Sequence, residues 1–192
     1  MKMQMIIALG FVLAVLSSAA VAQERVLFKF DTVNAAKPWQ IVNDGVMGGR
    51  SDGRFRINPA KNMEFFGTLS LENNGGFASV RARGERFGLQ PGDVIVARVR
   101  GDGRQYNFNL YAQRNLGGYS YRQSFKTLKD QWVDVKMPVE NFVATWRGRT
   151  FPNQKLDLSQ VSGLGILLGD KMPGPFKLEV EWIKVEKRSV NK

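Results

Sequence analysis

IVARVRGDGRQYNFNL, residues 95–110, decides the fold class of this chain. Apolar and polar residues alternate on both sides of a central Asp-Gly pair, and a period of two indicates β-strands. Asp-Gly is typical of a type I′ turn, in which both central residues have positive φ. The stretch therefore predicts a hairpin in which Val99 faces Tyr106 and Arg98 faces Asn107. In this register one face is entirely apolar and consists of Ile95, Ala97, Val99, Tyr106, Phe108 and Leu110.

The same alternation recurs through the rest of the chain. Short alternating runs are separated by turn residues, and the 20 glycines fit a sandwich or barrel. We expect further strands at residues 26–30, 63–71, 132–137, 164–168 and 176–182, and single helical turns at 138–142 and 156–161. Trp39, Trp132 and Trp182 lie in alternating runs and are expected in the core. The pattern predicts an all-β antiparallel sandwich that closes over Ile95, Ala97, Val99, Phe108, Leu110, Phe176, Leu178 and Val180.

The N-terminus has the features of an export signal. Lys2 precedes an uncharged apolar run, Met5–Leu16, and the following small residues end in an A-x-A-like cleavage site, Ala20–Ala22. We therefore predict a signal peptide at residues 1–22 and a single domain at residues 23–192, exported to the periplasm or secreted. An uncleaved N-terminal anchor is the alternative. No other segment is long and apolar enough to predict a membrane-spanning helix.

The chain contains no cysteine and no histidine. Their absence excludes disulfides, Ser-His-Asp and Cys-His catalysis, and zinc sites built from these residues. The net charge of +11 favours polyanionic partners, but the basic residues are scattered along strands, so a solvated basic surface is the plainer interpretation. Export argues against nucleic acid as the natural partner. We assign no cofactor and no metal, because no D-x-D-x-D-G run is present.

Three glycine-rich loops, at residues 43–51, 72–77 and 101–104, stand out as candidate sites. Their Asn, Asp and Arg side chains suit ligand binding, although Asn and Asp also close turns by bonding to their own backbone. The first loop lacks the spacing of a phosphate-binding loop. A fourth candidate is the WRGR segment at residues 146–149, because Trp and Arg are enriched where proteins bind one another. The candidate binding residues are Asn43, Asp44, Met47, Gly48, Gly49, Ser51, Asn73, Asn74, Arg100, Asp102, Arg104, Trp146, Arg147 and Arg149.

These segments resemble the signature of the complex I intermediate-associated protein family. The resemblance is carried by WxxVNDGVMGGRS at residues 39–51, FxGxLSLENNGGFASVR at 65–81, VRGDGRxY at 99–106, Trp132 with Met137-Pro138, WRGR at 146–149 and GPFKLEVEWI at 174–183. Six matches in series cover nearly all of the chain after residue 22. The resemblance implies a galactose-binding-like jelly roll, and mitochondrial members are assembly factors for NADH:ubiquinone oxidoreductase. The export signal departs from an assembly role on the matrix or cytoplasmic side of that complex.

Three classes of function follow from these observations. The first is a non-catalytic exported protein that resembles the assembly factors and acts by protein–protein contact. The second is a carbohydrate-binding module of the cell envelope, with an aromatic platform from Tyr106, Tyr111, Tyr119, Tyr121 or Trp146. The third is a glycan-acting enzyme that uses two carboxylates drawn from Asp44, Glu72 and Asp102, whose pKa values should then shift in opposite directions. We predict that the chain is not an enzyme. The oligomeric state does not follow from the sequence.

Overall fold

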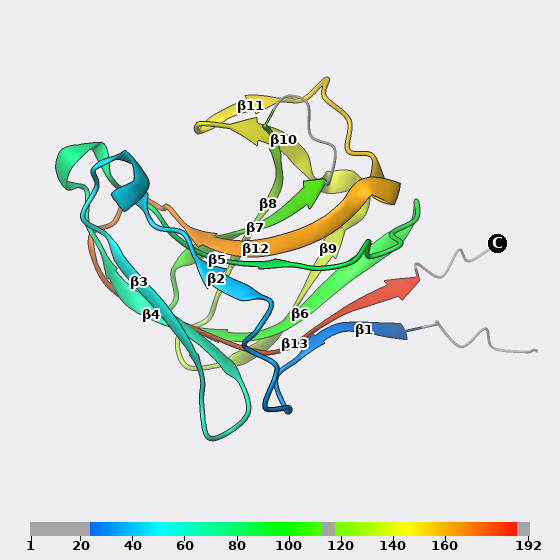
Figure 1. Cartoon of the computed structure of the whole chain (residues 1–192), viewed down its shortest axis with the longest axis horizontal. Helices are drawn as coiled ribbons and strands as arrows, with labels where there is room; N and C mark the ends of the chain where they lie inside the picture. The colour runs from blue at the N-terminus through cyan, green and yellow to red at the C-terminus, as the bar shows by residue number, and fades with distance from the viewer. Residues whose placement is uncertain (1–23, 113–117, 188–192) are drawn as a thin grey trace, which may run out of the picture.

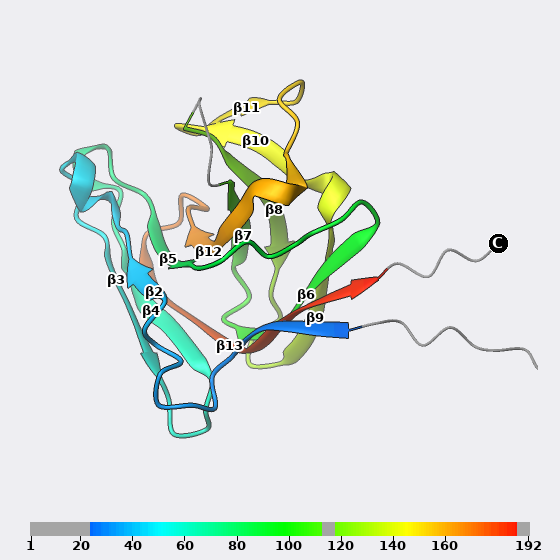
Figure 2. The same ribbon diagram turned by 45° about the vertical axis from the view of Figure 1, so that its right-hand side comes forward.

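Alternating apolar strands pair into two antiparallel sheets that pack face to face (Figures 1 and 2). The computed structural model describes residues 24–112 and 118–187. One sheet has six strands in the order β3-β4-β13-β6-β9, and β1 pairs with the second half of β13. These strands are β1 (Glu24–Lys29), β3 (Asp52–Ile57), β4 (Met63–Leu69), β6 (Asp93–Gly101), β9 (Trp132–Pro138) and β13 (Gly174–Lys187).

The other sheet has seven strands in the order β11-β10-β8-β7-β12-β5-β2. They are β2 (Trp39–Ile41), β5 (Ala78–Arg83), β7 (Gln105–Ala112), β8 (Ser120–Lys126), β10 (Val143–Trp146), β11 (Arg149–Phe151) and β12 (Val161–Leu168). Four short 3-10 helices complete the described part of the chain: η1 (Asp44–Met47), η2 (Glu72–Asn74), η3 (Val139–Asn141) and η4 (Leu158–Gln160). The helical turns predicted at 138–142 and 156–161 are thereby confirmed. No helix in residues 24–112 and 118–187 has the length and hydropathy needed to span a membrane.

The hydrophobic core lies between the inner faces of the two sheets. All eight predicted core residues are buried there, and the antiparallel sandwich predicted from the sequence is confirmed. Trp39 is also buried, but Trp132 and Trp182 are not, so the prediction of core positions for them is wrong. In β13 a bulge between Val180 and Trp182 reverses the alternation, and Ile183 takes the inward position. Trp132 lies outside the core, beneath the guanidinium groups of two arginines.

The hairpin predicted at residues 95–110 is wrong, because β6 and β7 belong to different sheets. Val99 pairs with Val180 and Val133, not with Tyr106. Of the two central turn residues only Gly103 has positive φ, so a type I′ turn does not form. The chain instead crosses between the sheets at residues 101–104. The predicted apolar face, made of Ile95, Ala97, Val99, Tyr106, Phe108 and Leu110, is nevertheless buried in the core, although the pairing fails. Asn109, predicted on the face open to water, is buried as well.

Four loops extend from one end of the sandwich. Leu69 lies opposite Gly174, while Leu168 lies between Ala78 and Tyr106 in the sheet register. The loops that follow or precede these positions therefore emerge together, and Figures 1 and 2 show the η1 and η2 loops side by side. We call residues 43–51, 70–77, 101–104 and 169–173 the loop end. The predicted signal peptide at residues 1–22 lies outside the described residues.

Candidate functional site

Asp44 joins the first two glycine-rich loops. Its side chain is fully buried, and Oδ1 accepts a hydrogen bond from the Ser51 backbone N–H at 2.9 Å. Oδ2 accepts from Ser51 Oγ at 2.6 Å and from the N–H groups of Gly76 at 2.6 Å and Phe77 at 3.2 Å. Burial raises the pKa of the Asp44 carboxyl, but the four donors outweigh burial and hold this pKa below its ordinary value. Asp44 is therefore an ionised structural anchor of the loop end.

The glycines around Asp44 are required by close packing. A Cβ at Gly49 would lie 2.4 Å from Asp44 Cγ, and one at Gly75 would lie 2.6 Å from Asp44 Oδ2. Asn43 supports the same junction, since its Nδ2 donates to the Gly53 carbonyl oxygen at 3.0 Å. Asn43, Asp44, Gly49 and Ser51 were candidates for ligand binding, and the structure uses the polar groups or the close packing of each to hold the two loops together.

The third loop is anchored by a buried ion pair. Arg104 is 9% exposed, and its Nε and Nη2 donate to Asp170 Oδ2 and Oδ1 at 2.9 and 2.6 Å. Asp102 Oδ1 accepts from the Arg104 N–H at 3.0 Å, and its Oδ2 accepts from the Tyr106 hydroxyl at 3.0 Å and the Lys177 N–H at 2.9 Å. Burial raises the pKa of the Asp170 carboxyl, but hydrogen bonds from Arg104 and the Met172 N–H lower it overall. Sequence inspection missed Asp170, which lies far along the chain from Arg104.

The exposed surface of the loop end is apolar as well as polar. Val46 and Met47 are 74% and 62% exposed, and Leu71 and Met172 on adjoining loops are 42% and 51% exposed. We call these four exposed residues, which lie on three loops of the loop end, the apolar patch. Asn73 and Asn74 are exposed beside it, and both have positive φ, which shapes the η2 turn. Gly48 is also exposed, with φ of 88° after η1. Of the candidate residues in these loops, Met47, Gly48, Asn73 and Asn74 thus remain available to a partner.

An open groove of about 790 Å³ lies beside the apolar patch. Leu71 and Pro173 line it from two different loops, and Arg50 and Glu72 form an exposed ion pair at 2.8 Å at its margin. The sequence contained one signal for this surface, because Val46-Met47 places two large apolar residues in an otherwise polar, glycine-rich loop. Leu71 and Met172 gave no comparable signal.

Arg100 and the WRGR segment lie elsewhere. Arg100 is on the outer face of the six-stranded sheet, where it donates to both oxygens of Glu179 at 3.0 and 2.9 Å. Trp146, Arg147 and Arg149 form the β10–β11 hairpin at the edge of the seven-stranded sheet, and the Arg147 guanidinium lies 4.8 Å from the Trp146 ring centroid. Trp146 is exposed. The hairpin is therefore a separate candidate contact surface.

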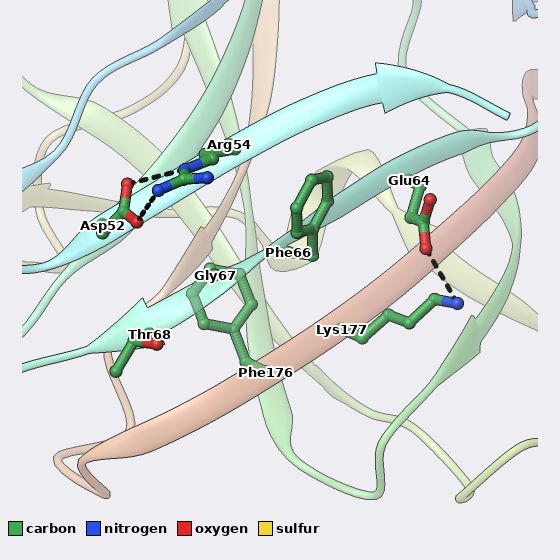
Figure 3. Close-up of a pocket in the computed structure, with 8 residues that line it drawn as sticks. All are labelled: Asp52, Arg54, Glu64, Phe66, Gly67, Thr68, Phe176 and Lys177. Carbon is green, nitrogen blue, oxygen red and sulfur yellow. Dashed lines mark hydrogen bonds and ion pairs between the residues drawn. The ribbon is translucent and has the colours of Figure 1, made fainter.

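A second hollow, of about 390 Å³, lies on the outer face of the six-stranded sheet between β3, β4 and β13 (Figure 3). Its charged groups are paired with one another. Asp52 pairs with Arg54 at 2.5 Å and Glu64 with Lys177 at 2.8 Å, and both pairs are drawn in Figure 3. Because these charges are already neutralised within the protein, the hollow has no unpaired charge on these residues with which to select an ionic ligand.

The carboxylates do not form an acid–base pair. Asp44, Glu72 and Asp102 belong to three separate networks, with Ser51, Arg50 and Tyr106 as respective partners. Glu64 and Glu179 are cross-strand neighbours, and a catalytic pair would need opposed pKa shifts. Arg56 lowers the pKa of Glu64; burial raises that of Glu179, but Arg100 and Lys177 lower it overall. Both carboxyls are thus held ionised. In residues 24–112 and 118–187 no group of three acidic side chains is arranged to hold a metal ion.

The profile of the family described as complex I intermediate-associated protein 30 matches residues 28–180. The chain belongs to this family. The resemblance of the six signature segments is thereby confirmed. The mitochondrial complex I intermediate-associated protein 30 of Mus musculus is 29% identical over 192 residues, which cover 88% of this chain and 58% of the relative. The Drosophila melanogaster protein is 25% identical over 188 residues, covering 84% of this chain and 62% of the relative. The chain thus spans less than two thirds of the length of either relative.

This chain shares its fold with carbohydrate-binding modules. It resembles the family 11 carbohydrate-binding module of Clostridium thermocellum, solved in complex with a β-1,3-1,4-mixed-linked tetrasaccharide, with a TM-score of 0.64 and 16% identity. The match covers 87% of this chain and 96% of the module. The similarity establishes the fold as a galactose-binding-like jelly roll, as expected. At this identity it does not carry the ligand over.

Proposed function

We propose that this chain is a non-catalytic, exported binding protein that acts by protein–protein contact through the loop end. The apolar patch carries this proposal. A rigid surface with several large exposed apolar side chains marks a protein-binding site more often than a catalytic one. Asp44 and the Arg104–Asp170 pair hold the surrounding loops, so the patch loses little conformational freedom when a partner binds.

Membership of the complex I intermediate-associated family supports the same kind of role. The name of the relatives describes association with a complex I intermediate, and such association requires a protein surface and no chemistry of its own. The +11 net charge favours a partner with negative charge around an apolar contact. The role proposed here is therefore that of an assembly factor or chaperone for an acidic protein of the envelope.

The proposal is tested with the chain recovered from the cells that make it. Cross-linking and mass spectrometry identify the partner, and the purified pair then gives a dissociation constant. We expect Met47→Ser with Leu71→Ser to weaken this binding at least tenfold, because large apolar contacts dominate such interfaces. Trp146→Ala with Arg147→Ala is the matched control on the separate β10–β11 hairpin. A partner that is lost with the hairpin variant and kept by the loop-end variant would move the contact to the hairpin and overturn the assignment.

Export has its own test. Intact-mass measurement on the chain recovered from the envelope fraction should give a polypeptide that begins at Gln23. A chain in the envelope fraction that keeps residues 1–22 supports the uncleaved anchor. A chain found only inside the cell contradicts the exported role and leaves the contact surface testable.

A carbohydrate-binding role is the second candidate. Tyr106 and Tyr121 are buried in the core and offer no sugar platform. Asp44, Asp102 and Arg104 are engaged within the fold, so the loop end provides few groups for a glycan. The observation that favours this candidate lies on the outer face of the seven-stranded sheet.

A further inference from the structure

The seven-stranded sheet contains basic residues and no acidic ones. Its strands contribute five basic residues, and none of its strands contains Asp or Glu. On the outer face of the six-stranded sheet the opposite holds, since arginines such as Arg98 and Arg100 pair with carboxylates there. None of the ion pairs among the described residues involves Arg81, Arg83 or Arg122. The outer face of the seven-stranded sheet therefore carries uncompensated positive charge.

The strand register brings two of these arginines toward each other. Ala78, Val80 and Ala82 of β5 face the core, so Arg81 faces outward, and the same alternation places Arg122 of β8 on that outer face. A single cross-strand row runs Arg81, Gly165, Asn109, Arg122 over β5, β12, β7 and β8. The backbone positions of the two arginines thus flank a strip that has no side chain on β12 and an amide on β7.

Gly165 lets Arg81 lie across the sheet. A Cβ at this position would lie 3.1 Å from Arg81 Cγ and 2.8 Å from the Val80 carbonyl oxygen. The Arg81 guanidinium lies 5.4 Å from the Tyr111 ring centroid, and Tyr111 is on β7, beyond the glycine-bearing strand. From the other side, Arg122 Nε donates to Asn109 Oδ1 at 3.0 Å. Both arginines are therefore directed to the Asn109–Tyr111 segment.

Each of the two guanidinium groups is held by one hydrogen bond and can still donate others. Arg81 uses Nε to donate to Ser79 Oγ at 3.0 Å, and Arg122 uses Nε for Asn109. Within the described residues the terminal nitrogens of neither guanidinium make a hydrogen bond. Burial lowers the pKa of Arg122, and the nearby charge of Arg81 lowers it further. Two like charges directed to the same half-buried segment are relieved by an anion that accepts hydrogen bonds from both.

We propose that this face binds an acidic saccharide whose carboxylate or sulfate lies between Arg81 and Arg122. The surrounding groups match sugar hydroxyls, because Asn107 of β7 and Ser124 of β8 provide an amide and a hydroxyl on the same face. Asn109 is buried and serves to hold Arg122. Tyr111 is covered by Arg81, so its ring is not a bare platform for stacked bases. This proposal specifies the class of ligand for the carbohydrate-binding role, the second candidate function. It does not depend on protein contact at the loop end.

The test is calorimetric titration of the full chain with a tetrasaccharide of galacturonic acid, beside its methyl ester, which is neutral. A sulfated tetrasaccharide and inorganic phosphate complete the set of probes. We expect the acid to bind at least tenfold more tightly than the ester at physiological salt. Arg81→Gln and Arg122→Gln should each weaken binding about tenfold to a hundredfold, the usual range for losing hydrogen bonds between charged groups. Arg98→Gln, an ion-paired arginine on the opposite sheet, is the matched control and should bind as the unmodified chain does.

The outcomes are distinct. Tighter binding of the sulfated probe, lost in the same variants, supports the site and identifies a sulfate ester as its anion. Equal affinity for acid and ester, binding that survives both variants, or phosphate binding as tight as the tetrasaccharide overturns the proposal. If Arg122→Gln does not fold, NMR titration of the unmodified chain with the acidic tetrasaccharide replaces it. Changes in amide chemical shift on β7 and β8 support the site, and changes confined to other strands overturn it. Met47→Ser with Leu71→Ser should leave saccharide affinity unchanged, so this site and the loop-end contact fail independently.

Discussion

Replacing Asp44 by Asn tests whether this carboxylate holds the loop end together. Asn has nearly the same shape as Asp but carries no charge, and one of its two terminal atoms donates instead of accepting. Asp44 Oδ2 accepts from three donors, Ser51 Oγ and the N–H groups of Gly76 and Phe77. An Asn in this place would turn its Oδ1 toward these three donors, and its Nδ2 would then face the Ser51 N–H, which would lose its acceptor inside a buried junction.

The expected cost has two parts. One buried N–H left without an acceptor costs about 1–3 kcal/mol, and a neutral amide oxygen accepts the other three hydrogen bonds more weakly than a carboxylate does. We therefore expect Asp44→Asn to lower the free energy of unfolding by about 4 kcal/mol. That is a large share of the roughly 5–15 kcal/mol typical of a folded domain. Urea denaturation followed by tryptophan fluorescence at pH 7 measures it. Glu72→Gln is the control, because its ion pair with Arg50 is exposed and should contribute less than about 1 kcal/mol.

The effect of Asp44→Asn should also depend on pH in a known direction. The folded-state pKa of Asp44 lies below its ordinary value, so the ionised carboxyl contributes stability that is complete above the unfolded pKa of about 3.9. This contribution is lost as the pH falls through the folded pKa. The stability difference between the unmodified chain and the variant should therefore be constant from pH 7 to about pH 5 and shrink below about pH 4. A difference under about 1 kcal/mol at pH 7, or one that does not change with acid, would refute this account of Asp44.

Two further predictions concern packing and strand pairing. Gly75→Ala should lower the free energy of unfolding, measured by urea denaturation, by about 1–3 kcal/mol, because its Cβ would collide with the Asp44 carboxylate. A Cβ at Gly45 meets no atom within 4 Å, so Gly45→Ala should change this free energy little, and equal effects of the two variants would contradict the packing argument. Because the chain has no native cysteine, pairs of introduced cysteines report strand neighbours directly. Arg98→Cys with Asp134→Cys should form a disulfide on oxidation, seen as a shift on a non-reducing gel. Arg98→Cys with Asn107→Cys should form none. The reverse result would restore the hairpin predicted from the sequence.

The burial pattern could be predicted from the sequence because alternation is a local property. Ile95, Val99, Phe108 and Leu110 face the core whatever strand lies beside them, since a strand in a sandwich needs only one apolar face. Strand pairing is not local. A hairpin and a crossing between two sheets both direct the apolar residues of 95–110 inward, so the pattern could not distinguish them. The partner of Val99 is Val180, at the other end of the chain, and no feature of the stretch itself indicates that pairing.

The sequence predicted where the glycine-rich loops gather, but not which of their side chains are buried and which are exposed. The three glycine-rich loops do lie at one end of the sandwich, which the signature segments suggested. Asp44 and Arg104 are buried, while Met47 and Asn73 are exposed, although all four lie in loops of similar composition. Burial of a loop residue depends on what crosses over it, and for Asp44 that is the backbone at Gly76 and Phe77. Loop composition therefore indicates a junction, and only the contacts show which side chains are used to build it.

The outer face of the seven-stranded sheet shows the same limit more sharply. Arg81 and Arg122 are outward residues of ordinary alternating strands, and alone each is explained as a solvated side chain. Their significance arises from the order of β5, β12, β7 and β8, which sets one glycine and one asparagine between them, and from the absence of acidic residues in the whole sheet. Neither fact is visible until the strands have been assigned to sheets. A scattered set of arginines in the sequence thus yields two that are directed to one segment without an acidic partner, whereas Arg98, in an equally ordinary strand, pairs with both Asp134 and Glu181.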